Sequence, residues 1–127
     1  MNATTRRRVE VFEMNGLRAI CKLRRVDRVR NNRIKEMCEW KKSMTERAEQ
    51  GVLRWFGHLI RMNEERIVKK VFNSEVDGER GRGRPKLRWM DGVSELLNRR
   101  GLGLQEGVRV AGDRREWRRI VHADEGQ

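Results

Sequence analysis

Arginine is the residue type in this chain whose abundance points most directly to a chemical role. The 127 residues include 24 arginines and 7 lysines against 19 acidic residues, which gives a formal net charge of +12. A guanidinium group is planar and presents paired N–H donors that match two phosphate oxygens, whereas a lysine ammonium acts as a point charge. An arginine-rich chain is therefore typical of a protein that binds the phosphate backbone of a nucleic acid.

The positive charge is concentrated in the first quarter of the chain. Between Arg6 and Lys35 there are eleven basic and three acidic residues, so this stretch carries +8 of the total. Such clustering is what a contact surface for a polyanion requires. We predict phosphate contacts from five arginines of this stretch, namely Arg24, Arg25, Arg28, Arg30 and Arg33.

A second basic surface is predicted on a helix that begins near Ser43. Ser43-Met44-Thr45-Glu46 fits a capping box, in which the serine hydroxyl and the glutamate carboxylate each accept a hydrogen bond from a backbone N–H group. On a helical wheel, one arc of this helix is apolar, and the adjoining arc carries basic side chains and no acidic ones. The apolar arc consists of Met44, Ala48, Val52, Trp55, Leu59 and Met62, and the basic stripe of Arg47, Arg54, His58 and Arg61. The stripe either contacts a phosphate backbone or is simply the solvent-exposed face of the helix. His58 has no candidate nucleophile near it in sequence, so we interpret it as a packing or phosphate-contacting residue and not as a general base.

The segment 77–85 contains three glycines and the chain's only proline, and it is predicted to be a linker. Within it, Arg82-Gly83-Arg84-Pro85 matches the core of an AT-hook, whose glycine lets the backbone enter a narrow A·T minor groove. A solvated linker explains the same residues equally well. The candidate backbone contacts here are Arg80, Arg82, Arg84 and Lys86, followed by Arg88.

Tryptophan side chains beside arginines are candidates for stacking on unpaired bases. Trp55 and Trp117 lie on apolar arcs of their helices and are predicted to be core residues. Trp89, next to Arg88, is the better stacking candidate, although a core position remains an alternative for it as well.

Hydrophobic periodicity indicates an all-α fold of about five to seven helices. The first runs from about Arg6 to Arg25 with an apolar stripe of Val9, Phe12, Gly16, Ile20 and Leu23. Further helices are predicted after the caps Asp27, Ser43 and Asn63, from near Pro85 to Gly101, weakly around Gly103, Gly107 and Gly112, and from Asp113 to Val121. We predict a basic helical lobe at 1–76, the linker at 77–85, a second lobe at 86–122, and a disordered tail at 123–127, with both termini frayed.

Other function classes find little support in the sequence. Two cysteines, Cys21 and Cys38, and two histidines, His58 and His122, do not have the spacing of zinc ligands, so no metal or cofactor is predicted. The cysteines are expected to be reduced and packed as small hydrophobic residues of an intracellular protein. We expect no membrane span, no signal peptide and no small-molecule substrate. No nucleophile, base and orienting group occur together, so no catalytic residue is predicted.

Five blocks of sequence, in order, resemble the carboxy-terminal region of non-LTR (LINE-type) retrotransposon endonuclease-reverse transcriptase polyproteins. They lie within about Arg7 to His122 and cover nearly the whole chain. The blocks are Val9–Met14 with Leu17-Arg18, Asp27–Asn31, Leu53–His58 with Arg61-Met62, Gly81–Pro85 with Trp89 and Asp91, and Asp113–Arg118. Any one of them is weak, and the order makes the match specific.

The resemblance implies a position downstream of the polymerase palm, where this region extends the thumb and contacts template RNA or target DNA. Polymerases of this class hold two metal ions with paired palm aspartates, whereas the five aspartates here are separated and tyrosine is absent. We therefore expect a non-catalytic nucleic-acid-binding segment without the palm and the endonuclease. Its expected partners are RNA, DNA and the missing polymerase domain, and its expected location is inside the cell, in the nucleus. Gly107 and Gly112 depart from the family's helix formers, and no zinc knuckle follows.

Two alternatives stay open at this point. One is a small chromatin-associated protein that uses Arg82–Pro85 as an AT-hook. The other is the product of a decayed element that folds only in part.

Overall fold

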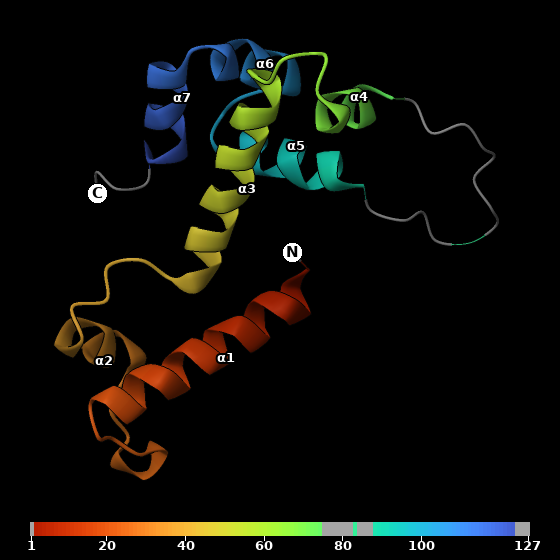
Figure 1. Ribbon diagram of the computed structural model, residues 1–127. Coiled ribbons are helices and arrows are strands. Elements are labelled where there is room, and N and C mark those ends of the chain that lie inside the picture. The colour runs from red at the N-terminus through yellow and green to blue at the C-terminus, as the bar shows by residue number, and fades with distance from the viewer. Residues whose placement is uncertain (1, 75–82, 84–87, 124–127) are drawn as a thin grey trace. The chain divides into compact units, whose positions relative to one another are not determined.

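The computed structural model describes residues 2–74, 83 and 88–123, and all regular elements in these ranges are helical (Figure 1). The all-α prediction is confirmed. The elements are α1 (Ala3–Ile20), the 3₁₀ helix η1 (Arg25–Asp27), α2 (Asn31–Met37), α3 (Met44–Ile60), α4 (Ile67–Asn73), α5 (Trp89–Arg99), α6 (Leu104–Gly112) and α7 (Arg114–Val121).

The chain divides into two compact units, Met1–Glu49 and Gln50–Gln127. The boundary lies within α3, and this differs from the sequence prediction, which places it at the segment 77–85. The reason lies in the core of the second unit, where residues from before and after that segment pack into one cluster. Within the segment itself, only Gly83 belongs to the described residues.

The first unit is built on the packing of α1 against α2, which lies by the carboxy-terminal end of α1 in Figure 1. Its core consists of Met14, Leu17 and Ile34. The predicted apolar stripe of α1 is wrong, because Phe12 and Ile20 are 70% and 72% exposed. Two apolar stripes lie side by side on this helix, and Ile34 covers the one that contains Met14 and Leu17.

A buried carboxylate joins α1 to the start of α3 in the first unit. Glu13 is only 5% exposed, and its Oε1 accepts hydrogen bonds from Trp40 Nε1 at 2.9 Å and from the backbone nitrogen of Met44 at 2.6 Å. Lys35 Nζ lies 3.9 Å from its other oxygen. These partners satisfy the buried charge, as a carboxylate out of water requires.

The capping box before α3 is confirmed. Ser43 Oγ accepts from the Glu46 nitrogen at 3.2 Å, and Glu46 Oε2 accepts from the Ser43 nitrogen at 2.9 Å. The other two predicted caps do not start the helices expected of them. Asp27 accepts from the Arg24 nitrogen at 2.6 Å and closes η1, whereas α2 begins at Asn31 without a side-chain cap.

Similarly, Asn63 accepts a hydrogen bond from the Glu65 nitrogen at 2.9 Å in a turn, and α4 begins only at Ile67.

A buried lysine, Lys69, caps the end of α3. Lys69 Nζ donates to the carbonyl oxygens of Leu59 and Ile60 at 3.0 and 3.2 Å. The last carbonyls of a helix have no partner within it, and an ammonium also suits the negative end of the helix dipole.

In the second unit, α5, α6 and α7 gather around the carboxy-terminal half of α3 (Figure 1). The predicted apolar arc of α3 is displaced by about one residue. Leu53 and Phe56 are fully buried, and Leu59 is buried as predicted, whereas Trp55 is 45% exposed. The core of this unit comprises Leu53, Phe56, Val93, Leu96, Leu97, Val110, Ala111, Trp117 and Val121.

Two glycines of this unit fit where a side chain would not. At Gly57 a Cβ atom would lie 2.2 Å from Trp117 Nε1, and at Gly107 it would lie 2.6 Å from Leu97 Cδ1. Gly107 lowers the helix propensity of α6, but the absence of a side chain there lets α6 pack closely against α5, and this packing offsets the loss.

The predicted end of α5 at Gly101 is confirmed. Gly101 has φ +73°, its nitrogen donates to the Asn98 carbonyl, and Leu102 donates to the Leu97 carbonyl. This is the Schellman pattern that glycine favours. The start of α7 is also as predicted, since Asp113 Oδ1 accepts from the nitrogens of Arg115 and Glu116 at 2.7 and 3.2 Å.

Candidate nucleic-acid interface

Basic side chains of α3 and α7 line a groove of about 250 Å³ in the second unit. We call it the α3–α7 groove. Four arginines and two histidines contribute to it, and none of its described lining residues is acidic. The lining residues are Arg54, His58, Arg61, Arg114, Trp117, Arg118, Val121 and His122.

The position of these side chains follows from the helices that carry them. Arg54 and His58 lie on α3, and Arg61 directly follows the last residue of that helix. They are four and three residues apart, so they share one side of the helix next to the buried Leu53 and Phe56. On α7, Arg114 and Arg118 are four residues apart beside the buried Trp117. The hydrogen bond from Trp117 Nε1 to the Leu53 carbonyl, 2.9 Å long, fixes the two helices together.

Within the groove Arg61 is half-buried, and its Nη1 donates to the Ala111 carbonyl at 2.5 Å. Burial lowers the pKa of the Arg61 guanidinium from its usual value, and the like charge of Arg114 lowers it further. The groove thus holds cationic groups close enough to repel one another, and an anion bound between them would relieve that repulsion.

Three of the four residues of the predicted basic stripe therefore meet in this groove. The fourth, Arg47, lies over the ring of Trp40 at 4.9 Å from its centroid, an arrangement that gives its charge a local packing role. Sequence reasoning missed Arg114 and Arg118. The available signal was their spacing of four residues on a helix whose adjoining arc carries the apolar Trp117 and Val121.

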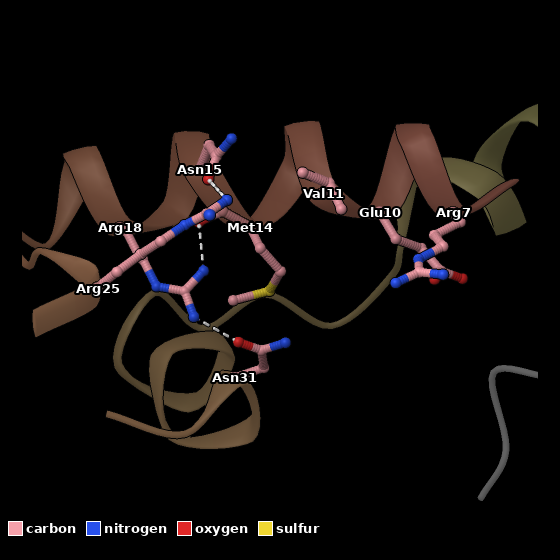
Figure 2. A pocket seen from close by; sticks show the side chains of 8 residues that line it. All are labelled: Arg7, Glu10, Val11, Met14, Asn15, Arg18, Arg25 and Asn31. Atoms are coloured by element: carbon pink, nitrogen blue, oxygen red, sulfur yellow. Dashed lines mark hydrogen bonds between the residues drawn. The ribbon is translucent and has the colours of Figure 1, made fainter. Parts of the chain in front are cut away.

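A second groove, of about 360 Å³, runs along α1 in the first unit (Figure 2). We call it the α1 groove. Arg18 donates to Asn31 Oδ1 at 2.6 Å and to the Met14 carbonyl at 3.5 Å, and Arg25 donates to Asn15 Oδ1 at 3.3 Å. Figure 2 shows these groups at one end and Arg7 with Glu10 at the other. The lining residues are Arg7, Glu10, Val11, Met14, Asn15, Arg18, Arg25 and Asn31.

Of the five arginines predicted in the first quarter, only Arg25 lines the α1 groove. Arg24, Arg28 and Arg30 are exposed outside it, and Arg33 forms a 3.2 Å ion pair with Glu36. The amides of Asn15 and Asn31 position Arg25 and Arg18, and this arrangement could not be read from helical periodicity, because it depends on the turn between α1 and α2.

Of the three tryptophans discussed for stacking, Trp55 differs from its predicted core position. Trp117 is buried, as predicted, but Trp55 is exposed and its ring lies 5.4 Å from that of His58. Trp89 is 41% exposed, with ring centroids 6.4 Å from Phe56 and 6.2 Å from Phe72. Trp55 consequently offers a stacking face next to the α3–α7 groove, whereas Trp89 is partly covered by the core.

The remaining predicted contacts are Arg80, Arg82, Arg84 and Lys86, which lie outside the described residues. The AT-hook prediction falls on the same segment. Arg88 is exposed, and its backbone nitrogen donates to Asp91 Oδ2 at 2.8 Å where α5 begins.

Two further findings concern the described part of the chain. It contains no group of three or more His, Cys, Asp or Glu residues placed to hold a metal ion. None of its helices combines the length and the apolar composition needed to cross a membrane.

No protein-family model, no curated protein and no solved structure matches this chain. Its function is therefore inferred from its own residues.

Proposed function

We propose that the chain is a non-catalytic nucleic-acid-binding protein and that the α3–α7 groove is its principal contact with the phosphate backbone. The observation that carries this proposal is the convergence of Arg54, Arg61, Arg114 and Arg118 on one groove without an acidic lining residue. Surface arginines of a merely soluble protein tend to alternate with acids, as Arg109 does with Glu106 at 2.5 Å.

The chemistry of the groove suits phosphodiesters better than a single small anion. Arginines from two parts of the chain line the groove, so successive phosphates can each accept hydrogen bonds from a separate guanidinium. Each such contact releases condensed counterions, which strengthens binding at low salt. The α1 groove offers a second set of guanidinium groups, from Arg7, Arg18 and Arg25, in the first unit.

The exposed ring of Trp55 favours a ligand that has unpaired bases. It lies beside His58, which lines the α3–α7 groove. A duplex keeps its bases stacked on one another, whereas a single strand or a loop can place one on an aromatic side chain. We infer that the ligand is a single-stranded or looped nucleic acid.

We also propose that the chain is related to the post-palm region of non-LTR retrotransposon polyproteins. The support for this is the order of the five sequence blocks. Two of the blocks, Leu53–His58 and Asp113–Arg118, contribute most of the α3–α7 groove, so the family relation and the binding proposal concern the same residues. In this view the polymerase domain of such elements is the natural partner of the chain.

Fluorescence anisotropy with labelled single-stranded RNA, single-stranded DNA and duplex DNA tests the proposal. The double variant Arg54→Gln/Arg114→Gln is expected to bind about tenfold or more weakly and to lose about 1.4 from the slope of log K against log salt for single strands. The matched control is Arg109→Gln/Arg115→Gln, which removes the same charge from residues outside both grooves.

Equal losses in the two double variants would show that net charge alone drives binding and would overturn the assignment of the groove. Absence of salt-dependent binding by the unmodified chain would overturn the function itself. Displacement by a ligand of the A·T minor groove would favour the AT-hook alternative.

A further inference from the structure

Two thiols that are seventeen residues apart in sequence touch in the first unit. The Sγ atoms of Cys21 and Cys38 lie 2.9 Å apart, and both residues are free, half-buried cysteines. A disulfide bond would require the sulfur atoms to approach by roughly another 1 Å. From the sequence we expected each cysteine to pack separately as a small hydrophobic residue, and the contact between the two was not predicted.

The contact is held by regular structure on both sides. Cys21 is the C-cap of α1 and Cys38 the C-cap of α2, and the next residues, Lys22 and Glu39, have φ of +54° and +50°. Both helices end in the same hydrogen-bonding pattern, with Leu23 donating to the Arg18 carbonyl at 2.9 Å and Trp40 to the Lys35 carbonyl at 2.8 Å.

The core beneath the pair holds the two helix ends together. Leu17 and Ile34 are buried one helical turn before Cys21 and Cys38, respectively. Both cysteines pack against the core cluster that these two residues form with Met14. Cys38 Sγ also lies 3.7 Å from the Leu17 carbonyl, which can accept its proton. The hydrogen bond with Cys21, together with burial, raises the pKa of the Cys38 thiol, so Cys38 is favoured in its protonated form.

We propose that Cys21 and Cys38 form a reversible intramolecular disulfide by exchange with a small-molecule disulfide such as oxidised glutathione. In the first step a cysteine thiolate attacks the external disulfide, forms a mixed disulfide and releases one small thiol. The second cysteine then attacks the protein sulfur of the mixed disulfide and releases the second small thiol. The two cysteines lose two protons and two electrons, and the external disulfide gains both.

The bond would close a loop whose interior, residues 22–37, contains much of the basic charge of the first unit. Its arginines are Arg24, Arg25, Arg28, Arg30 and Arg33. Cross-linking a loop of this length restricts the unfolded chain, so the folded first unit and the disulfide should stabilise each other. This inference does not depend on whether the chain binds nucleic acid.

The test is the equilibrium between dithiol and disulfide in glutathione buffers, measured on the full chain by acid quenching, alkylation and mass spectrometry. The expected product is the Cys21–Cys38 disulfide, with little mixed disulfide. The ratio of disulfide to dithiol in a fixed buffer should fall by about a hundredfold when the chain is unfolded in urea. Cys21→Ser and Cys38→Ser should each carry one glutathione instead.

Two results would overturn the inference. One is a disulfide ratio that is the same in buffer and in urea, since folding would then contribute nothing to bond formation. The other is accumulation of mixed disulfides or of intermolecular dimers in the unmodified chain. Because the urea comparison uses the unmodified sequence, it decides the matter even if the serine variants fail to fold.

Discussion

The indole nitrogen of Trp117 in α7 donates a 2.9 Å hydrogen bond to the carbonyl oxygen of Leu53 in α3. The indole reaches that carbonyl because Gly57, one turn further along α3, has no side chain. The bond satisfies a buried donor and places Arg114 and Arg118 next to Arg54 and Arg61. The arrangement of the four arginines in the groove therefore depends on the packing of two uncharged residues, Trp117 and Gly57.

Gly57→Ala should destabilise the second unit. The new methyl group would lie 2.2 Å from Trp117 Nε1, so α7 must shift, and we expect a loss of about 1–3 kcal/mol in the free energy of unfolding in urea. Gly51→Ala on the same helix is the matched control, since nothing lies within 4 Å of its added Cβ. That control should gain up to ~1 kcal/mol from helix propensity. Equal effects of the two changes would refute the close approach.

Lys69→Met should also weaken the second unit. The substitution keeps the packing of the side chain but removes the donor for the carbonyls of Leu59 and Ile60, with an expected loss of about 1–3 kcal/mol in urea unfolding. Lys70→Met, at an exposed position, should change stability by less than about 0.5 kcal/mol. If both variants are equally stable, the lysine does not cap α3.

Acid should loosen α7 through its N-cap. Backbone hydrogen bonds from Glu116 and Arg115 lower the pKa of Asp113 below the usual aspartate value. Because the folded pKa is the lower one, the stabilisation is fully present above about pH 3.9, the unfolded value, and is lost as pH falls through the folded value. Helicity followed by circular dichroism should show this loss in the natural chain.

Asp113→Asn retains an oxygen that accepts the same backbone hydrogens, so it serves as the control. Its helicity should depend less on pH over the same range. A variant that loses helicity along the same acid curve as the natural chain would assign the transition to other carboxylates.

Trp55→Leu should separate single-stranded from duplex binding. Loss of a stacking partner should weaken binding of single-stranded RNA or DNA by about fivefold or more, with little change for duplex DNA, as measured by anisotropy. Phe12→Leu removes another exposed aromatic ring, from α1, and should leave both affinities unchanged. A parallel decrease for single strands and duplex would mean that Trp55 supports the fold of the groove and does not stack on a base.

Features that depend on neighbours in sequence were predictable. The capping box at Ser43 and Glu46 and the end of α5 at Gly101 each require only a few consecutive residues, and both occur as expected. The buried face of α3 was not predictable, since Leu53 and Phe56 compete with Val52 and Trp55 as apolar pairs of equal spacing. Which pair is buried depends on the partner helix.

The candidate site shows the same limit. Arg54, His58 and Arg61 could be placed on one side of a helix from their spacing, but Arg114 and Arg118 join them only through contacts across some sixty positions of sequence. The contact between Cys21 and Cys38 likewise required two helices to end side by side. Amphipathic patterns describe one element at a time, and both of these arrangements belong to pairs of elements.

The burial of Lys69 makes two consecutive lysines chemically unequal. Lys69 is 5% exposed and engaged at the end of α3, whereas its neighbour Lys70 faces solvent. A reagent that acylates amines will therefore label Lys70 promptly and reach Lys69 only when this part of the molecule opens. The ratio of the two labels in a single peptide would report how often the second unit opens under native conditions.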